Sequence, residues 1–206
     1  MQRNDAYTQS STFQMPDKAE KALKRSIDLQ TLQKTAVEKE LLIPRGAIRN
    51  RVKELACRIS SDHKGREIVL IGILNGVIFF FADLVRELTV PARIDFIRAK
   101  SYGSGTISSR DVRFTKDVEI PLHDRSVILV EDIVDTGLTL KRIIDRIENE
   151  GPESLRTCAL IEKLERREIE VPIDYCGFRV KEGFVVGYGL DYNEKYRNLP
   201  DVYVLK

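Results

Sequence analysis

The sequence is poor in residues that form covalent cross-links or bind soft metals. It has no tryptophan, two histidines and three cysteines among 206 residues. The cysteines are Cys57, Cys158 and Cys176, which lie far apart in apolar-rich stretches and lack Cys-x-x-Cys spacing. Neither a disulfide framework nor a zinc site is therefore indicated. We expect three buried thiols in a protein that stays in a reducing compartment.

Long hydrophobic runs are also missing. The longest one, 68–82, is interrupted by Gly72, Asn75 and Gly76. It falls short of the ~20 residues that a membrane span needs. Residues 1–15 contain no apolar segment of the secretory type. These absences predict a cytoplasmic protein without a membrane-spanning helix.

The sequence also lacks a large excess of positive or negative charge. The 34 Lys and Arg residues against 32 Asp and Glu leave a net charge of +2, and no basic block is present. A nucleic-acid partner is therefore not favoured. Because 42% of the residues are hydrophobic, a chain of this length buries a sizeable core without a disulfide or structural metal.

What is present is an alternation of strand and helix patterns. Residues 1–33 are polar and predict a mobile or weakly helical arm before one domain at 34–206. Within that domain, the continuous apolar run 68–74 predicts a strand buried on both faces, as in a parallel sheet. We also expect strands at 92–99, 126–130 and 155–161 and helices at 48–59, 77–88 and 138–150. The alternation predicts an α/β domain that binds ligands at the carboxyl ends of its strands.

Two regions break this alternation. Residues 101–116 are rich in Gly, Ser and Thr and poor in apolar residues, which predicts a mobile functional loop that acts as a lid. The tail 175–205 has short β-like pieces at 178–180, 184–188 and 202–205, separated by glycines and by Pro200. It predicts a small subdomain, here called the hood, over one end of the sheet.

The segment 127–140 carries the sharpest chemical signal. A predicted buried strand ends at Glu131 and Asp132, and small hydroxyl and glycine residues from Asp135 to Thr139 then open a helix. Backbone N–H groups and hydroxyls at a helix N-terminus bind phosphate. Two carboxylates beside that phosphate suit the hydroxyls of a ribose together with Mg²⁺. The segment therefore predicts a site for a phosphorylated ribose.

A purely structural interpretation of the same residues is available. Asp135 and Thr136 can serve as a helix cap, with Glu131 and Asp132 solvated. A cap does not require two carboxylates at the end of a strand, so the combination favours the binding site.

Segment 127–140 resembles the phosphoribosyl-diphosphate (PRPP) motif of the type I phosphoribosyltransferases, and the chain from about 40 to 205 resembles their hypoxanthine-guanine branch. The other matching motifs are Ile73-Leu74-Asn75-Gly76 in the diphosphate loop, Lys100-Ser101-Tyr102-Gly103 at the start of the catalytic lid, and 184–192 in the purine-binding hood. The resemblance implies the type I phosphoribosyltransferase fold, an α/β fold with a mostly parallel twisted sheet flanked by helices. Its small hood, with C-terminal and N-terminal parts, would be formed mainly by 168–206.

The resemblance also implies an activity. The 5-phosphoribosyl group of PRPP would be transferred to hypoxanthine or guanine, giving IMP or GMP and diphosphate in purine salvage. Mg²⁺ would be the cofactor, PRPP and an oxopurine base the substrates, and the enzyme a homodimer or homotetramer. Preference among hypoxanthine, guanine and xanthine stays open.

Site residues follow from the matched motifs. The resemblance assigns proton transfer at purine N7 to Asp135, and lid closure to Ser101 and Tyr102. It assigns purine binding to Lys163 at the 6-oxo group, to a stacking Phe184, to the Val185 backbone and to Asp191. The residues it assigns to PRPP are Leu74, Asn75, Gly76, Glu131, Asp132, Thr136, Gly137, Thr139 and Arg197. Those it places near Mg²⁺ are Glu131, Asp132 and Asp191.

Three features depart from the family pattern. Relatives usually carry lysine in a non-proline cis peptide where this chain has Asn75, and glycine where the lid has Arg110. The arm 1–33 has no counterpart in compact relatives. These features leave open a non-catalytic or regulatory PRPP-binding protein that acts through a nucleic-acid or protein partner. A pyrimidine substrate is disfavoured by Lys163 and the hood motif.

Overall fold

The computed structural model describes residues 38–101 and 112–206. Residues 38–206 form one compact unit. The predicted arm 1–33 and the lid residues 102–111 lie outside the described residues, so the proposed domain boundary stays a prediction.

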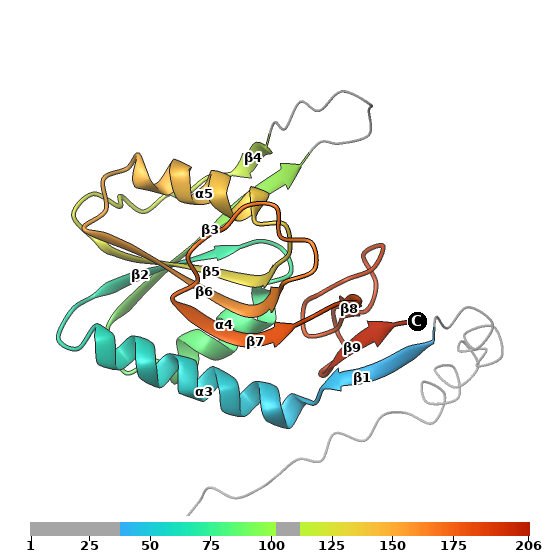
Figure 1. Ribbon diagram of the computed structural model, residues 1–206. Helices are drawn as coiled ribbons and strands as arrows, with labels where there is room; N and C mark the ends of the chain where they lie inside the picture. Colours follow the sequence, from blue (N-terminus) through green and yellow to red (C-terminus); the bar gives the residue numbers. More distant parts are fainter. Residues whose placement is uncertain (1–37, 102–111) are drawn as a thin grey trace, which may run out of the picture. The chain divides into compact units, whose positions relative to one another are not determined.

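A six-stranded sheet forms the centre of the unit, in the order β4-β3-β2-β5-β6-β7 (Figure 1). Its parallel strands are β2 (Ile68–Ile73), β3 (Ala92–Ser101), β5 (Ser126–Val134), β6 (Ser154–Lys163) and β7 (Tyr175–Val180). The edge strand β4 (Val112–Lys116) runs antiparallel to β3. Every residue of β2 is buried, as its continuous apolar run predicted.

Helices cover both faces of this sheet: α3 (Arg45–Asp62) and α4 (Ile78–Glu87) lie on one face and α5 (Leu138–Glu148) on the other. The alternation of side chains along each strand builds two cores. From β2, Ile68 and Leu70 pack with α3 and α4, whereas Val69 and Ile71 pack with α5. The predicted α/β fold is confirmed.

A three-stranded antiparallel sheet forms the hood, in the order β1-β9-β8. Its strands are β1 (Lys39–Ile43), β9 (Val202–Leu205) and β8 (Phe184–Val186). Val185 and Val202 belong to the same core as α3 and α4, so apolar packing holds the hood against the large sheet.

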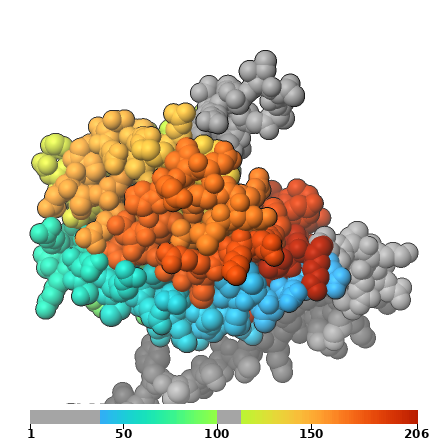
Figure 2. Space-filling view, viewed as in Figure 1, coloured from blue at the N-terminus to red at the C-terminus, as the bar shows by residue number. Residues whose placement is uncertain are grey.

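The predicted extent of the hood was wrong at one strand. Residues 178–180 were expected in the hood, but they belong to β7 and pair with β6 at the edge of the large sheet. Tyr175, Gly177 and Val180 of β7 are buried, and Tyr175 and Val180 belong to the core that α3 and α4 cover. In the space-filling view, the orange surface of β6, β7 and their connection lies between α3 and α5 (Figure 2).

Two further expectations need correction. The predicted lid 101–116 is shorter, because residues 112–116 form β4 against β3. The three thiols are not all buried: Cys57 is exposed, Cys176 is partly exposed and Cys158 is buried. Burial raises the pKa of the Cys158 thiol. Among the described residues, no helix has the length and apolar character that crossing a membrane requires.

Candidate active site

The predicted site residues gather where β2, β5 and β6 end and meet the hood. Parallel strands bring their carboxyl ends to the same edge of a sheet. Three connections therefore lie together: β2 to α4, β5 to α5, and β6 to β7.

The β5–α5 turn, 135–139, has the geometry of an anion-binding turn and is here called the phosphate loop. Gly137 is the N-cap of α5, with φ of +84°, and as a glycine it offers no side chain of its own to cap the helix. A Cβ at Gly137 would lie 2.3 Å from the Ile169 carbonyl oxygen, so this position accepts only glycine. The side chain of Thr136 accepts a hydrogen bond from the Leu138 N–H at 3.3 Å. Thr139, in the first turn of α5, is partly exposed.

The paired carboxylates lie within β5 rather than after it, because the strand continues to Val134. Asp132 is 8% exposed and Glu131 is partly buried. Burial, with the adjacent Asp132 carboxylate, raises the pKa of Glu131 well above its usual range. Burial also raises the pKa of Asp132, and the nearby Arg197 guanidinium opposes this shift.

The diphosphate loop lies directly against Asp132. The Leu74–Asn75 peptide is cis, as the resemblance implied. A Cβ on Gly76 would lie 1.7 Å from Oδ2 of Asp132, and a Cβ on Gly189 would lie 1.9 Å from the carbonyl oxygen of Gly76. The absence of side chains at these glycines thus lets β5, the diphosphate loop and the hood meet.

Asp135, the predicted proton-transfer residue at the start of the phosphate loop, faces Lys163, the predicted 6-oxo residue. Lys163 Nζ lies 3.8 Å from Asp135 Oδ1, and the Lys163 side chain is 8% exposed. Oδ1 of Asp135 is buried and has no hydrogen-bond partner among the described residues. Arg166 Nη1 lies 3.6 Å from the other oxygen. A buried acceptor without a donor marks a place for a ligand hydrogen bond.

The hood supplies two exposed aromatic rings. Phe184 and Tyr192 are 51% and 41% exposed, and their ring centroids lie 5.4 Å apart in an edge-to-face arrangement. Val185 is buried, and its strand β8 pairs with β9. Exposed aromatic faces of this kind suit the stacking of a flat heterocycle.

Arg197 links the remaining hood residues. Its Nη2 lies 2.8 Å from Oδ1 of Asp191, and its Nη1 donates to the Gly189 carbonyl at 2.8 Å. The other Asp191 oxygen accepts from the Glu194 N–H at 2.9 Å. Asp191 and Arg197 were predicted as separate ligands, and the structure brings them together as an ion pair.

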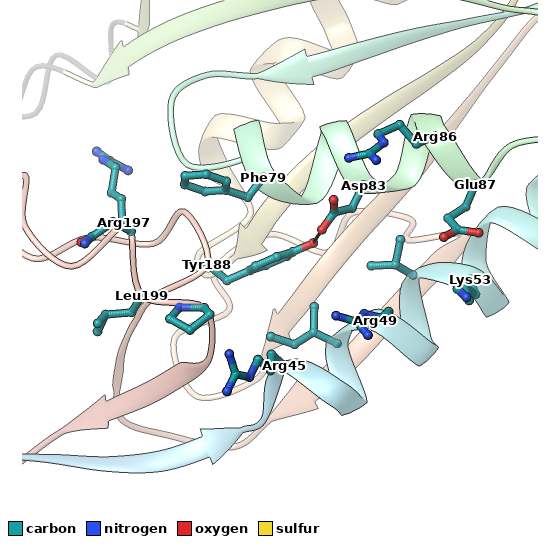
Figure 3. A pocket seen from close by; sticks show the side chains of 14 residues that line it. Arg45, Arg49, Lys53, Phe79, Asp83, Arg86, Glu87, Tyr188, Arg197 and Leu199 are labelled. Atoms are coloured by element: carbon teal, nitrogen blue, oxygen red, sulfur yellow. Dashed lines mark hydrogen bonds between the residues drawn. The ribbon is translucent and has the colours of Figure 1, made fainter. Parts of the chain in front are cut away.

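A cavity of about 680 Å³ lies beside these residues, between α3, α4 and the hood (Figure 3). It shares Arg197 with the predicted site. Tyr188 lines it and donates a hydrogen bond to Asp83 Oδ2 at 2.6 Å, which ties the hood loop to α4. Burial and the Asp83 carboxylate raise the pKa of Tyr188.

The lid residues are the part of the prediction that the structure does not describe. Ser101 is the last residue of β3, and nothing of its side chain is described. Tyr102 and Arg110 lie outside the described residues.

Several residues that the structure brings to this site had no role predicted from the sequence: Tyr192, Tyr188, Gly189, Arg166 and Arg167. Tyr192 follows Asp191 within the hood motif 184–192, so its position in the sequence was a usable signal. Arg166 and Arg167 belong to a charged run, Glu165-Arg166-Arg167-Glu168, which is typical of a solvated loop. The sequence alone contains no signal that Arg167 is buried.

Comparisons with known proteins agree with this geometry. Residues 44–193 match the model of the phosphoribosyl transferase domain family. The chain is 44% identical over 165 residues to a hypoxanthine phosphoribosyltransferase of Salmonella typhimurium, covering 79% of this chain and 93% of the relative. It is 37% identical to the hypoxanthine-guanine phosphoribosyltransferase of Bacillus subtilis, covering 85% and 97%. A solved hypoxanthine-guanine phosphoribosyltransferase from Bacillus anthracis matches with a TM-score of 0.78 and 40% identity, covering 83% of this chain and all of that one (100%).

Proposed function

This chain belongs to the hypoxanthine-guanine phosphoribosyltransferase family, and from that premise we propose that it transfers the 5-phosphoribosyl group of PRPP to hypoxanthine or guanine. The products are IMP or GMP and diphosphate, which makes the enzyme one of purine salvage. The observation that carries the proposal is the ion pair of Asp135 and Lys163, which adjoins the phosphate loop at Thr136 and Gly137.

The phosphate loop binds the 5′-phosphate of PRPP in this proposal. Backbone N–H groups at the start of α5, with the hydroxyls of Thr136 and Thr139, face an anion at the positive end of the helix. Glu131 and Asp132 then hold the ribose hydroxyls, since carboxylate oxygens accept hydrogen bonds from a diol.

The purine lies between the hood and the β6–β7 connection. Phe184 stacks on the base and the Val185 backbone bonds its edge, while Lys163 donates to the 6-oxo oxygen. Bond formation between purine N9 and ribose C1′, with cleavage of the C1′–O bond to diphosphate, leaves a proton on N7. Asp135 accepts this proton, and its buried oxygen without a donor supports that role.

Diphosphate leaves toward the loop 74–76, whose backbone N–H groups stabilise the negative charge that develops there. Arg197 contacts the same group. Closure of the lid by Ser101 and Tyr102 excludes water from the reacting carbon.

Mg²⁺ is the proposed cofactor. Among the described residues, no group of three His, Cys, Asp or Glu side chains is placed to hold a metal. Glu131, Asp132 and Asp191 supply carboxylate oxygens, which fit Mg²⁺ when substrate phosphates and water complete the shell. When bound, the ion neutralises charge on the diphosphate.

We expect removal of Mg²⁺ to lower turnover strongly. Assays with excess EDTA should show transfer lowered by about 10²-fold or more, because a divalent cation contributes several kcal/mol to stabilising such a leaving group. Added Mg²⁺ should restore the rate. Full activity in EDTA, with metal content checked by elemental analysis, would contradict the assignment.

The activity is tested with purified protein, PRPP and Mg²⁺, offering hypoxanthine, guanine, xanthine, adenine and uracil in turn. We expect turnover of an oxopurine and none of uracil. Calorimetric PRPP binding without turnover of any base would favour the alternative, a non-catalytic PRPP-binding protein with a protein or nucleic-acid partner. Salt-dependent binding would identify the nucleic-acid version.

Replacing Lys163 by alanine should raise the KM for the oxopurine by about 10- to 100-fold, because a hydrogen bond to a charged group is lost in a buried site. The KM for PRPP should change much less. Lys181→Ala is the matched control, since Lys181 is an exposed hood lysine. An unchanged oxopurine KM in Lys163→Ala would rule out the 6-oxo role.

We also propose that the enzyme is a cytoplasmic homodimer or homotetramer. Ile78 and Phe79 on α4 are 49% and 43% exposed, and such apolar side chains are suited to burial between copies. Light scattering on the full chain distinguishes monomer, dimer and tetramer. No membrane partner is proposed, and the net charge of +2 does not favour nucleic acid.

A further inference from the structure

Arg167 is a buried charged residue to which the proposed chemistry assigns no role. Its side chain is 9% exposed. Nη2 lies 3.4 Å from Oε1 of Glu162 and 3.4 Å from the carbonyl oxygen of Lys163. Nη1 is buried and has no hydrogen-bond partner among the described residues. Buried polar groups are nearly always paired, so an unpaired guanidinium nitrogen calls for an explanation.

The guanidinium lies against the phosphate loop. A Cβ built on Gly137 would lie 3.4 Å from Nη1 of Arg167. The next two residues are bound to the same loop, because the N–H groups of Glu168 and Ile169 both donate to the Thr136 carbonyl at 3.0 Å. Residues 167–169 thus support the phosphate loop from the side of the β6–β7 connection.

The charge around Arg167 is not balanced. Glu162 Oε1 faces Arg167, while its Oε2 is bound by Arg179 Nε at 3.0 Å. Two guanidinium groups therefore share one carboxylate, and the excess positive charge adjoins the loop. Because the Arg167 side chain is buried, its charge is screened less than a surface charge and favours an anion in the loop more strongly.

We propose that Arg167 is a positioning residue that raises the affinity for the 5′-phosphate of PRPP. It does so by packing its guanidinium against the Gly137 turn and by placing positive charge behind that turn. The proposal deepens the proposed function and rests on its assignment of the phosphate loop to that phosphate.

Arg167→Met tests the proposal in the full-length enzyme. We expect the KM for PRPP to rise by about 10-fold or more, as for loss of an interaction with a charged group. We expect kcat and the KM for hypoxanthine to stay within about threefold, as for substitutions away from the chemistry. Calorimetry should show IMP, which carries the same phosphate, binding more weakly by the same factor. Equal losses in all of these quantities would overturn the proposal.

Arg179→Met is the matched control. Arg179 binds the same carboxylate, but its side chain is 71% exposed, so its charge is screened by solvent. We expect its KM for PRPP to stay within about threefold of the wild type. An equal rise in both variants would show that loss of net charge alone matters, contrary to the proposal.

A second pair of variants separates this role from simple support of the fold. In Glu162→Gln/Arg167→Met, the Glu162 carboxylate is no longer left without Arg167, and the partner that it gives up, Arg179, has a side chain that is 71% exposed, so a purely structural defect should be relieved. We expect its thermal stability to recover relative to Arg167→Met while the KM for PRPP stays raised. Arg167→Lys keeps the charge and should recover part of the PRPP affinity. Recovery of the KM by the double variant would refute the proposal.

Thr139→Ala distinguishes this inference from the assignment on which it rests. If Thr139→Ala raises the KM for PRPP and Arg167→Met does not, the phosphate loop is correctly assigned and the Arg167 proposal is wrong. If neither variant raises it, the assignment of the loop itself fails.

Discussion

Asp135→Asn should lower kcat by about 10²- to 10⁴-fold, the range that general acid-base groups contribute, while PRPP binding changes little. The amide keeps the shape of the side chain but accepts no proton from N7. Steady-state kinetics in both substrates, with PRPP affinity from calorimetry, separate the two effects.

The position of Asp135 supports that separation. Its buried oxygen lies 3.8 Å from Lys163 Nζ, whereas the loop that receives the 5′-phosphate is built from the backbone of the following residues. An amide at 135 therefore leaves the phosphate contacts in place. Equal losses in kcat and in PRPP affinity would remove the acid-base role from Asp135.

Asp145→Asn is the matched control for the same chemical change. Asp145 lies in α5 and pairs with Lys141 at an exposed i,i+4 position, where solvent screens the contact and its contribution is small. We expect wild-type kinetics. Thermal unfolding of both variants checks that the loss in Asp135→Asn is not a loss of fold, since Lys163 also depends on Asp135 for its ion pair.

Most helices and strands were predictable because the apolar pattern that marks each of them lies within a short stretch of sequence. β2 and the helix faces are continuous or periodic in apolar residues over short windows, so each element could be predicted from its own residues. β1 could not, because four of its five residues are exposed and its partner β9 lies at the other end of the chain. Pairing between distant segments leaves no mark on a single short window.

The site was predictable in its chemistry rather than in its geometry. Glu131, Asp132, Asp135 and Thr136 form one run after a buried run, and topology brings such runs to one edge of the sheet. The burial of Arg167 depends on how the β6–β7 connection folds back on Gly137. The contact of Gly76 with Asp132 likewise joins the diphosphate loop to β5, two segments that are separate in sequence, which no spacing rule reveals.

That last contact leads to the second large expected effect. Gly76→Ala should lower kcat/KM for PRPP by about 10²-fold, the loss that follows a displacement of about 1 Å in a reacting group. A Cβ at this position would lie 1.7 Å from Asp132 Oδ2 and 2.7 Å from its Cγ. The Asp132 carboxylate must therefore move away from the ribose hydroxyls and the Mg²⁺ that it is proposed to hold.

Gly46→Ala is the control that makes this result interpretable. Gly46 lies in the first turn of α3, and a Cβ there meets nothing within 4 Å. We expect it to leave kcat/KM unchanged and to raise stability slightly, by up to about 1 kcal/mol, since alanine is the better helix former.

Gly76→Ala should still fold, because the clash is with the end of a side chain rather than with backbone. Overpacking of this kind typically lowers the free energy of unfolding by about 1–3 kcal/mol, which urea titration measures. Wild-type kcat/KM for PRPP in a folded Gly76→Ala would show that Asp132 can move without loss of function, and the assignment of Asp132 to the ribose would then fall.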